Sequence, residues 1–354
     1  MMKRVRVKIV GGTGYTGGEL IRILLRHPGV EILSITAGSV DSPRPIHHFW
    51  PALRGECALL VKKEDAAEPC PAEAVFLSTP HGVSMKLAQA YLDQGCTVFD
   101  LSADFRFPNP DDRIGWYPEP HPPASLCREA VYGMPELFRD QIAKARLISC
   151  PGCYATSVIL TLYPGVLLGL LEPQGIHVSS ASGVSGAGKN PKPHLHHPEV
   201  DQNFYAYRIG NHQHLPEILS VLKRATEKPV SLSFVPHLLP LRRGILSTIF
   251  CKKAGARSLQ DIWEGYHSIY GKEPFVRLYP LGESPNLHAV LETNFIDLSL
   301  HEDQGTGEII LVSAEDNLVK GAAGQAVQNF NLKMGFAEET ALALTSRSLE
   351  PAIH

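Results

Sequence analysis

Apolar residues in the first half of the chain fall into two kinds of run. Four nearly continuous runs, at residues 5–10, 31–36, 74–79 and 97–102, are typical of buried strands. Helical spacing follows the first run, at 20–25, and the third, at 84–92. A last short run, Leu147-Ile148, precedes a Pro-Gly turn. Strands that alternate with helices predict an α/β fold with a parallel, doubly wound sheet.

Beyond about residue 157 the pattern changes. Residues 158–171 are predicted to be helical with a kink or break at Pro164. Strands are predicted near 176–180, 231–237, 244–250, 288–296 and 308–313, which indicates a second domain with a mixed sheet. Helical spacing returns at 318–334 and ends at Gly335, which fits a C-cap. The Pro-rich stretch 107–130 has no period and is predicted to be a long functional loop.

Glycines after the first predicted strand have the spacing of a dinucleotide-binding turn. Gly11 permits the tight turn, Gly14 lets the backbone approach a pyrophosphate, and Gly17 allows close packing of the next helix. The N-terminus of that helix then faces the phosphates. A structural loop without a ligand is the alternative.

The end of the second predicted strand indicates which dinucleotide is bound. An NAD site usually has Asp or Glu here for the ribose 2′-hydroxyl, whereas this chain has Thr36-Ala37-Gly38-Ser39, followed by Arg44. A hydroxyl and a cation suit a 2′-phosphate, so NADP is favoured over NAD. Asp41 argues weakly against this interpretation, and Arg44 also fits a solvated loop.

Cys153 follows the turn Pro151-Gly152 and is expected at or near a helix N-terminus. The helix dipole and unpaired N–H groups there stabilise a thiolate, which is the form that attacks a carbonyl carbon. A buried, inert cysteine is the alternative. The seven cysteines are scattered and predict no disulfide framework, and Cys150 and Cys153 lack partners at zinc spacing, so no metal is expected.

Polar residues of the second half supply an acid/base group and cations. We interpret His212 and His214 as acid/base and substrate contacts, since no third ligand is placed to complete a metal site. The Gly/Ser-rich stretch 182–189 suits backbone contacts with an anion or a flexible linker. The cations available for a carboxylate or phosphate are Arg106, Lys189, Arg208 and Arg243, each of which also fits a surface charge.

Composition narrows the class of protein. The chain has 354 residues, 44% hydrophobic and 19% charged, which fits about two soluble domains. A net charge of -3 without a basic block argues against nucleic acid as a partner. No apolar run reaches the roughly 20 residues of a membrane span, and the first strand runs directly into glycines, unlike a signal peptide. We expect a cytoplasmic protein, or an organellar one whose leader has been removed.

Eight segments, taken in order, carry a resemblance that spans residues 5–335. The chain resembles the N-acetyl-gamma-glutamyl-phosphate reductases, relatives of aspartate-semialdehyde dehydrogenase, in the segments 11–20, 100–106, 131–136, 151–156, 182–188, 212–218, 236–240 and 316–328. The resemblance implies a Rossmann-type domain over 1–152, completed by 317–354. It also implies an inserted α+β domain over 153–316 for catalysis, substrate and oligomer contacts. The chain departs from the family at Cys150, where Asn is usual, so a role for that position in this chain is open.

The family's reaction sets further expectations. The resemblance implies NADPH-dependent reductive dephosphorylation of N-acetyl-gamma-glutamyl phosphate in arginine biosynthesis, through a Cys153 thioester, with His214 as acid/base and His212 near the substrate. Substrate charge is expected at Arg106, Lys189, Arg208 and Arg243. Cofactor contacts are expected from Gly11, Thr13, Gly14, Tyr15, Thr16, Gly17, Ser39, Arg44, Pro80, Ser182, Gly186, Asn317 and Gly321. We expect a homodimer or homotetramer that acts on a small molecule.

Three alternatives stay open at this point. The same chemistry fits a carrier-bound aminoadipyl or glutamyl phosphate. A non-catalytic NADP-binding sensor would bind cofactor without phosphate-dependent reduction of NADP. A reversible disulfide between Cys150 and Cys153 is a further hypothesis.

Overall fold

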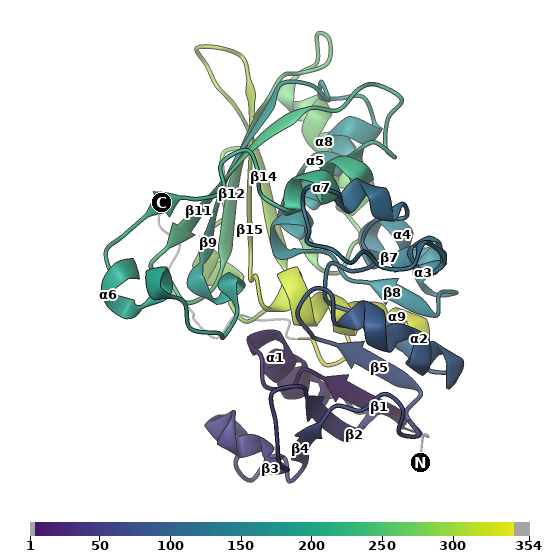
Figure 1. Cartoon of the computed structure of the whole chain (residues 1–354). Helices are drawn as coiled ribbons and strands as arrows, with labels where there is room; N and C mark the ends of the chain where they lie inside the picture. The colour runs from purple at the N-terminus through teal and green to yellow at the C-terminus, as the bar shows by residue number, and fades with distance from the viewer. Residues whose placement is uncertain (1–3, 343–354) are drawn as a thin grey trace. The chain divides into compact units, whose positions relative to one another are not determined.

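The apolar runs of the first half form parallel strands, as the sequence predicts. The computed structural model describes residues 4–342 (Figure 1), and these divide into two compact units. Residues of Met1–Gly152 and Ala322–Leu342 make the first unit, and Cys153–Gly321 make the second. The chain returns to the first unit at Ala322, five residues later than the predicted 317, so Asn317 and Gly321 belong to the second unit. The predicted completion over 343–354 lies outside the described residues.

The first unit is built on an eight-stranded sheet of order β3-β4-β2-β1-β5-β6-β8-β7. Its strands are parallel except for the short edge strand β3, which runs antiparallel to β4. Parallel neighbours need crossover connections, and helices supply several of them here. The strands are β1 (Val5–Val10), β2 (Val30–Ala37), β3 (Arg44–Pro45), β4 (Leu60–Lys63), β5 (Ala74–Leu77), β6 (Thr97–Asp100), β7 (Val131–Tyr132) and β8 (Leu147–Ser149).

Helices cover both faces of this sheet, which confirms the doubly wound prediction. The helices are α1 (Tyr15–Leu24), α2 (Ser84–Asp93), α3 (Ala124–Glu129), α4 (Pro135–Ile142) and α9 (Gly324–Met334). Helices α2 and α3 bury apolar side chains in one core with β5 and β6. On the other face α9 packs against α1 and α4, and its Phe330 contacts the stacked rings of Phe76 and Phe99. Helix α9 ends at Gly335, which has φ 76° and is the predicted C-cap.

The predicted long loop over 107–130 is only partly irregular. It contains a 3₁₀ turn at Pro110–Arg113 and the six-residue helix α3. Leu126 and Cys127 of α3 are buried in the core beneath α2, and this burial stabilises a helix too short to show a period in the sequence.

The second unit carries a seven-stranded mixed sheet of order β10-β11-β9-β12-β15-β14-β13. The pairs β9–β11 and β13–β14 are parallel and the others are antiparallel. Its strands are β9 (Ile176–Gly183), β10 (Tyr205–Ala206), β11 (Leu232–Leu239), β12 (Ile245–Cys251), β13 (Val276–Leu278), β14 (Ile296–Glu302) and β15 (Ile309–Glu315). Its helices are α5 (Cys153–Leu167), α6 (His197–Val200), α7 (His214–Leu222) and α8 (Leu259–Tyr270).

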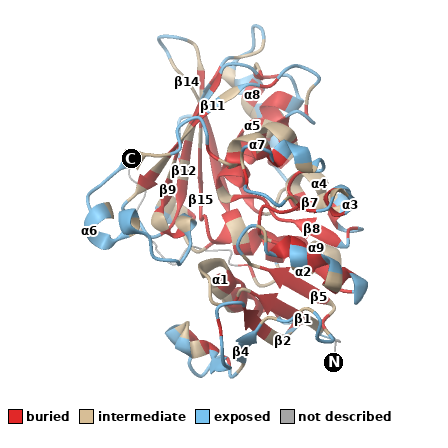
Figure 2. Ribbon diagram, in the orientation of Figure 1, coloured by how far each residue is buried: buried red, intermediate tan, exposed pale blue. Residues whose placement is uncertain are grey.

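Helix α5 lies at the centre of this unit. It packs on β12 and β15 and against α7 and α8, and Figure 2 shows it almost wholly buried. Of the predicted kink or break at Pro164, the break is wrong, because the helix continues through Pro164 to Leu167. Proline leaves the carbonyl four residues earlier without its helical donor, and the Tyr270 hydroxyl donates to that oxygen, on Leu160, at 2.7 Å.

The predicted strand over 288–296 is also wrong. Leu287–Ala289 form a 3₁₀ turn that Asn286 caps by accepting from Ala289 N at 3.2 Å, and β14 begins only at Ile296. No helix in the described part of the chain is both long and apolar enough to cross a membrane.

Four buried serines join α5 to three strands of the second unit. Ser157 Oγ lies 2.7 Å from Ser247 Oγ and 3.0 Å from Ser313 Oγ, and Ser180 Oγ lies 2.7 Å from Ser247 Oγ. Because their hydroxyls bond to one another, the loss of one member leaves buried polar atoms unsatisfied.

We predict that Ser157→Ala lowers the free energy of unfolding by about 1–3 kcal/mol. Urea unfolding at neutral pH checks this. Ser268→Ala, an exposed serine of α8 that bonds to its own helix, is the control and should change stability by under about 0.5 kcal/mol. Equal effects of the two variants would contradict a special role for the buried serines.

Candidate active site

Cys153 is the first residue of α5, as the sequence predicts. It follows β8 after only three residues, Cys150-Pro151-Gly152, so the thiol lies where the helix dipole favours a thiolate. Of the seven cysteines only Cys70 and Cys153 are half-exposed, and the other five are buried. Exposure and a helix N-terminus together distinguish Cys153 as the candidate nucleophile.

Gly321 lies directly beside Cys153 within the second unit. A Cβ on Gly321 would come within 2.8 Å of Cys153 Cβ and 3.0 Å of Glu315 Oε1, closer than such atoms pack. Sequence reasoning assigned Gly321 to the cofactor, and the structure shows that its missing side chain makes room for the nucleophile. Glu315, a buried carboxylate at the end of β15, was missed because nothing in its local sequence marks it.

The residue after the nucleophile brings two histidines into the site. The ring of Tyr154 lies 5.3 Å from that of His212 and 6.0 Å from that of His214, and the two histidine rings lie 4.8 Å apart, centroid to centroid. Both histidines are buried, and His214 begins α7. The structure therefore packs both sequence-predicted histidines against the residue that follows Cys153.

The two histidines are not equivalent. His212 Nδ1 accepts from the backbone N–H of His214 at 3.2 Å, which fixes the neutral tautomer with the proton on Nε2. Burial, with a smaller contribution from the nearby charge of Arg208, lowers the pKa of His212 to about 4. His212 is therefore a neutral ring that orients the start of α7, and His214 is left as the candidate for proton transfer.

Two tyrosines complete the wall of this cluster. The Tyr207 hydroxyl donates to the Tyr154 oxygen at 3.2 Å, and the Tyr154 hydroxyl donates to the carbonyl of His237 at 3.1 Å. Burial raises the pKa of Tyr207 to about 12 and that of Tyr154 further still, so both stay protonated. Tyr154 belongs to the 151–156 motif, whereas Tyr207 lies outside every motif and was missed.

The stretch 182–189 lies beside the segment that follows β15. Asn317 accepts from Gly244 N at 2.7 Å and donates to Ser185 Oγ at 3.0 Å. A Cβ on Gly186 would lie 3.5 Å from Ser182 Oγ and 3.7 Å from Asn317 Nδ2, so these three predicted residues are neighbours. This part of the chain is a defined 3₁₀ turn over Val184–Ala187 and not a free linker.

The four predicted cations lie in different settings. Lys189 and Arg208 are exposed, and Arg208 donates to Gln213 Oε1 at 2.9 Å. Arg243 is buried, with Nε 2.8 Å from Asp316 Oδ2 and Nη1 3.8 Å from Glu292 Oε1. Arg106 is buried in the first unit, where it donates to the carbonyls of Cys150 at 2.9 Å and Leu101 at 3.3 Å.

The predicted dinucleotide turn joins β1 to α1 in the first unit. Gly11 has φ 89°, and a Cβ there would come within 2.1 Å of Ser78 O, so only glycine fits. A Cβ on Gly17 would come within 2.3 Å of Gly11 O, which explains its role in close packing. Gly14 is the N-cap of α1, and Tyr15-Thr16 form its first turn after Thr13.

Trp50 covers this turn and was missed by sequence reasoning. Its indole donates to Gly12 O at 2.8 Å, and its ring lies 6.1 Å from that of Tyr15. Ser39 and Arg44 are exposed past the end of β2, and Arg44 Nη1 lies 3.2 Å from His48 Nε2. A cation and a hydroxyl are thus present at the strand end where the sequence predicts a 2′-phosphate.

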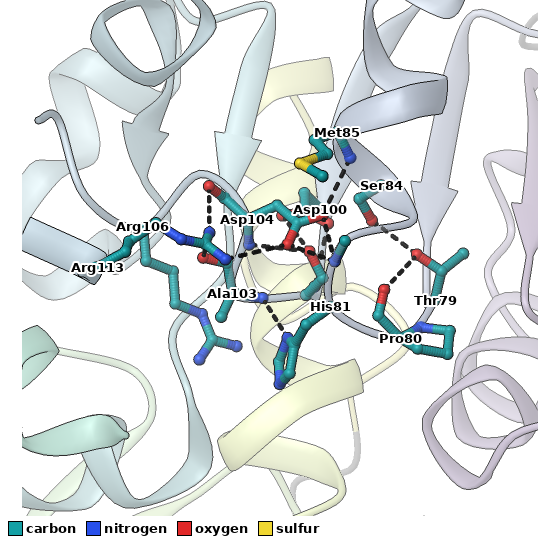
Figure 3. Close-up of polar contacts among 12 residues, drawn as sticks. Thr79, Pro80, His81, Ser84, Met85, Asp100, Ala103, Asp104, Arg106 and Arg113 are labelled. Atoms are coloured by element: carbon teal, nitrogen blue, oxygen red, sulfur yellow. Dashed lines mark hydrogen bonds and ion pairs between the residues drawn. The ribbon is translucent and has the colours of Figure 1, made fainter. Parts of the chain in front are cut away.

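A polar network holds the turn that contains Pro80 (Figure 3). Asp104 accepts from Gly82 N at 2.8 Å and Met85 N at 3.0 Å, and so caps the start of α2. The buried Arg113 donates to Asp104 O at 2.7 Å, and Ala103 N donates to His81 Nδ1 at 3.0 Å. Burial, with help from Asp104, raises the pKa of the neighbouring Asp100 to about 6. The segment 100–106 therefore shapes the turn after β5.

Cys150 is chemically the opposite of Cys153. It is buried and accepts from Asn329 Nδ2 at 3.8 Å. Burial, with a contribution from Asp100, raises its pKa to about 12, so it stays a thiol at neutral pH.

With the geometry in place, comparisons with known proteins identify the class. The family model described as semialdehyde dehydrogenase, NAD binding domain, matches residues 6–145, and the dimerisation domain of the same class matches 153–317. Aspartate semialdehyde dehydrogenase II of Vibrio cholerae has a similar fold, with a TM-score of 0.72 and 16% identity over 94% of this chain and 99% of that one. The Candida albicans enzyme, solved with NADP, has a TM-score of 0.68 and 16% identity over 93% of this chain and 98% of that one. The chain thus has the two domains of a phosphorylating semialdehyde dehydrogenase that binds NAD(P).

Curated relatives define the family more closely. N-acetyl-gamma-glutamyl-phosphate reductase of Desulforapulum autotrophicum is 46% identical over 96% of this chain and 98% of the relative. That of Citrifermentans bemidjiense is 44% identical over the same shares. The chain belongs to the N-acetyl-gamma-glutamyl-phosphate reductase family. This confirms the predicted family, enzyme class and fold.

The lowered pKa of His212 gives a pH dependence with a definite sign. The unfolded chain protonates His212 near the ordinary histidine pKa of 6.5, and the folded chain only near a pKa of about 4. The unfolded state therefore binds more protons between these values, and the contribution of His212 to stability is lost as the pH falls through them.

We predict that His212→Asn, which keeps an acceptor near Nδ1, reduces the loss of stability between pH 7 and pH 4.5 by about 1–3 kcal/mol. Urea unfolding at both pH values measures it. His196→Asn, at an exposed histidine, should leave the loss unchanged. Identical losses in the wild type and in His212→Asn would show that His212 does not carry this dependence.

Proposed function

We propose that the chain catalyses the NADPH-dependent reduction of N-acetyl-gamma-glutamyl phosphate to N-acetylglutamate semialdehyde and phosphate, a step of arginine biosynthesis. One observation carries the proposal most strongly. A half-exposed cysteine begins α5, and its neighbour Tyr154 packs on both buried histidines, in a chain of this family. The proposed roles of individual residues follow from their settings.

The first unit is proposed to hold the cofactor. The glycine turn ends at Gly14, the N-cap of α1, so the N-terminus of that helix is proposed to bind the pyrophosphate. Thr13, Tyr15 and Thr16 surround that turn, and Pro80 lies on the turn after β5. Ser39 and Arg44 are the proposed contacts of the 2′-phosphate. The bound cofactor supplies the hydride that reduces the acyl carbon.

Cys153 is proposed to attack the acyl phosphate. Its sulfur forms a bond to the acyl carbon, the carbon–oxygen bond to phosphate breaks, and phosphate leaves with the electron pair. The product is a thioester on Cys153. Backbone N–H groups at the start of α5 are the proposed donors to the oxyanion that forms on the acyl oxygen.

His214 is proposed to move the proton. It takes the proton of the Cys153 thiol before attack, and it later supplies a proton to the oxyanion of the thiohemiacetal. Collapse of that intermediate breaks its carbon–sulfur bond, and the hydroxyl proton passes through His214 to the leaving sulfur. The aldehyde is released and the Cys153 thiol is regenerated. His212 is proposed to hold the start of α7 and the substrate, because its Nδ1 already accepts from His214 N and its ring stays neutral.

The exposed cations Arg208 and Lys189 are the proposed contacts of substrate charge in the second unit. Arg243 is a weaker candidate, because Asp316 and Glu292 already neutralise it. Arg106 stays a proposed contact of substrate charge. Ser182, Gly186, Asn317 and Gly321 stay proposed cofactor contacts.

We further propose that the protein works in the cytoplasm as a homodimer or homotetramer. Residues 153–317 match a dimerisation domain, and on the mixed sheet β9, β11 and β12 alternate buried residues with half-exposed ones, including Phe250. All seven cysteines are free thiols, which suits a reducing compartment.

The proposal predicts phosphate-dependent reduction of NADP by the wild type with N-acetylglutamate semialdehyde. Cys153→Ser should lower kcat by about 10⁴ or more, because the thioester is lost. Absorbance at 340 nm measures both.

Cys70→Ser, at the other half-exposed cysteine, is the control and should keep activity. Near-normal turnover by Cys153→Ser would refute the covalent mechanism. Turnover confined to a carrier-bound aminoadipyl phosphate would replace the proposed substrate.

We also predict that His214→Asn lowers kcat by about 10²–10⁴, the usual contribution of an acid/base group. His212→Asn should lower kcat less and raise the KM for the semialdehyde. Steady-state kinetics of both variants across pH 6–9 separates the roles. A larger loss of kcat in His212→Asn than in His214→Asn would exchange them.

A further inference from the structure

Four polar side chains meet beneath the glycine turn of the first unit. They come from four elements: Lys8 from β1, Thr36 from β2, Glu64 directly after β4, and Tyr91 from α2. Glu64 Oε1 accepts from Lys8 Nζ at 3.2 Å and from the Tyr91 hydroxyl, and Glu64 Oε2 accepts from the Thr36 hydroxyl. The side chains of Lys8 and Glu64 are only 9% and 7% exposed. The proposed reaction uses none of these groups.

Thr36 connects this cluster to the proposed cofactor turn. Its side chain bonds to Glu64, and its backbone carbonyl accepts from Gly11 N at 2.7 Å and Gly12 N at 3.2 Å. Gly11, whose φ is 89°, donates its backbone N–H to that carbonyl. Thr36 is thus the single residue that links the Glu64 carboxylate to Gly11 and Gly12, the two glycines that begin the turn.

A contribution to stability does not by itself explain the cluster. A buried ion pair loses hydration on both partners, and apolar residues of similar size often stabilise a fold as well or better. Lys8 also neutralises Glu64 near the end of β2, where an unpaired carboxylate would repel a 2′-phosphate. The contacts of Glu64 with Thr36 and the neutralisation of Glu64 by Lys8 both favour a role of this cluster in cofactor binding.

We propose that Glu64 is a positioning residue for the cofactor: it fixes Thr36, and through it the amides of Gly11 and Gly12. This inference rests on the proposed function for the place where NADPH binds. It adds a dependence of cofactor affinity on a side chain that does not touch the cofactor.

The test measures the Kd of NADPH for the whole protein by fluorescence, without substrate. Thr36→Val removes only the hydroxyl and should raise Kd about fivefold to tenfold, with kcat at saturating NADPH within about twofold. Thr36→Ser keeps the hydroxyl and should restore Kd to within about twofold. Glu64→Gln keeps an acceptor but leaves Lys8 unneutralised, so it should lower Tm more than Thr36→Val and raise Kd less.

Thr161→Val is the matched control. Thr161 is a buried threonine of α5 whose hydroxyl donates to Ser157 O at 2.6 Å in the other unit. It should lower Tm without a change in Kd. An unchanged Kd in Thr36→Val, or equal changes of Kd in Thr36→Val and Thr161→Val, would overturn the positioning role and leave the proposed function intact. A wild type that does not bind NADPH would overturn both.

Discussion

The close approach of Cys153 and Gly321 is the constraint on which the second unit depends. Cys153 is its first residue and Gly321 its last before the chain returns to the first unit. A Cβ on Gly321 would lie 2.8 Å from Cys153 Cβ, so only glycine lets the two ends of the unit meet. The mixed sheet and the helices α5, α7 and α8 all lie in the stretch of chain between Cys153 and Gly321. The candidate nucleophile therefore lies where the chain enters the unit, with its position fixed by the segment that leaves it.

That departing segment is itself held by charge and hydrogen bonds. Asp316 pairs with Arg243 at 2.8 Å, and Asn317 accepts from Gly244 N at 2.7 Å. Burial raises the pKa of Asp316, and the guanidinium of Arg243 opposes that shift. Arg243 and Gly244, which directly precede β12, thus hold Asp316 and Asn317, which directly follow β15. Arg243 has a structural task here that a sequence motif does not reveal.

Features that depend on residues close together in the sequence were predicted correctly. Features that depend on partners far apart in the sequence were not. The parallel strands, the glycine turn, the start of α5 at Cys153 and the cap at Gly335 follow from local patterns. Pro164 was predicted to kink or break a helix, but the helix continues, and Tyr270 of α8 donates to the carbonyl that proline leaves without its helical donor. The short helix α3 forms because a core buries it. Trp50 of the first unit and Tyr207 of the second reach their partners, Gly12 and Tyr154, across long sequence separations, which no local pattern indicates.

The two cysteines that flank the Pro-Gly turn show how little sequence distance matters to reactivity. Cys150 precedes the turn and is buried, and its burial, with a contribution from Asp100, raises its pKa to about 12. Three residues later the chain begins a helix, and Cys153 lies at the N-terminus of that helix with partial exposure to water. The helix dipole and water both favour a thiolate, and of these two cysteines only Cys153 has both. Cys150 therefore adds a second sulfur to the motif without adding a second nucleophile.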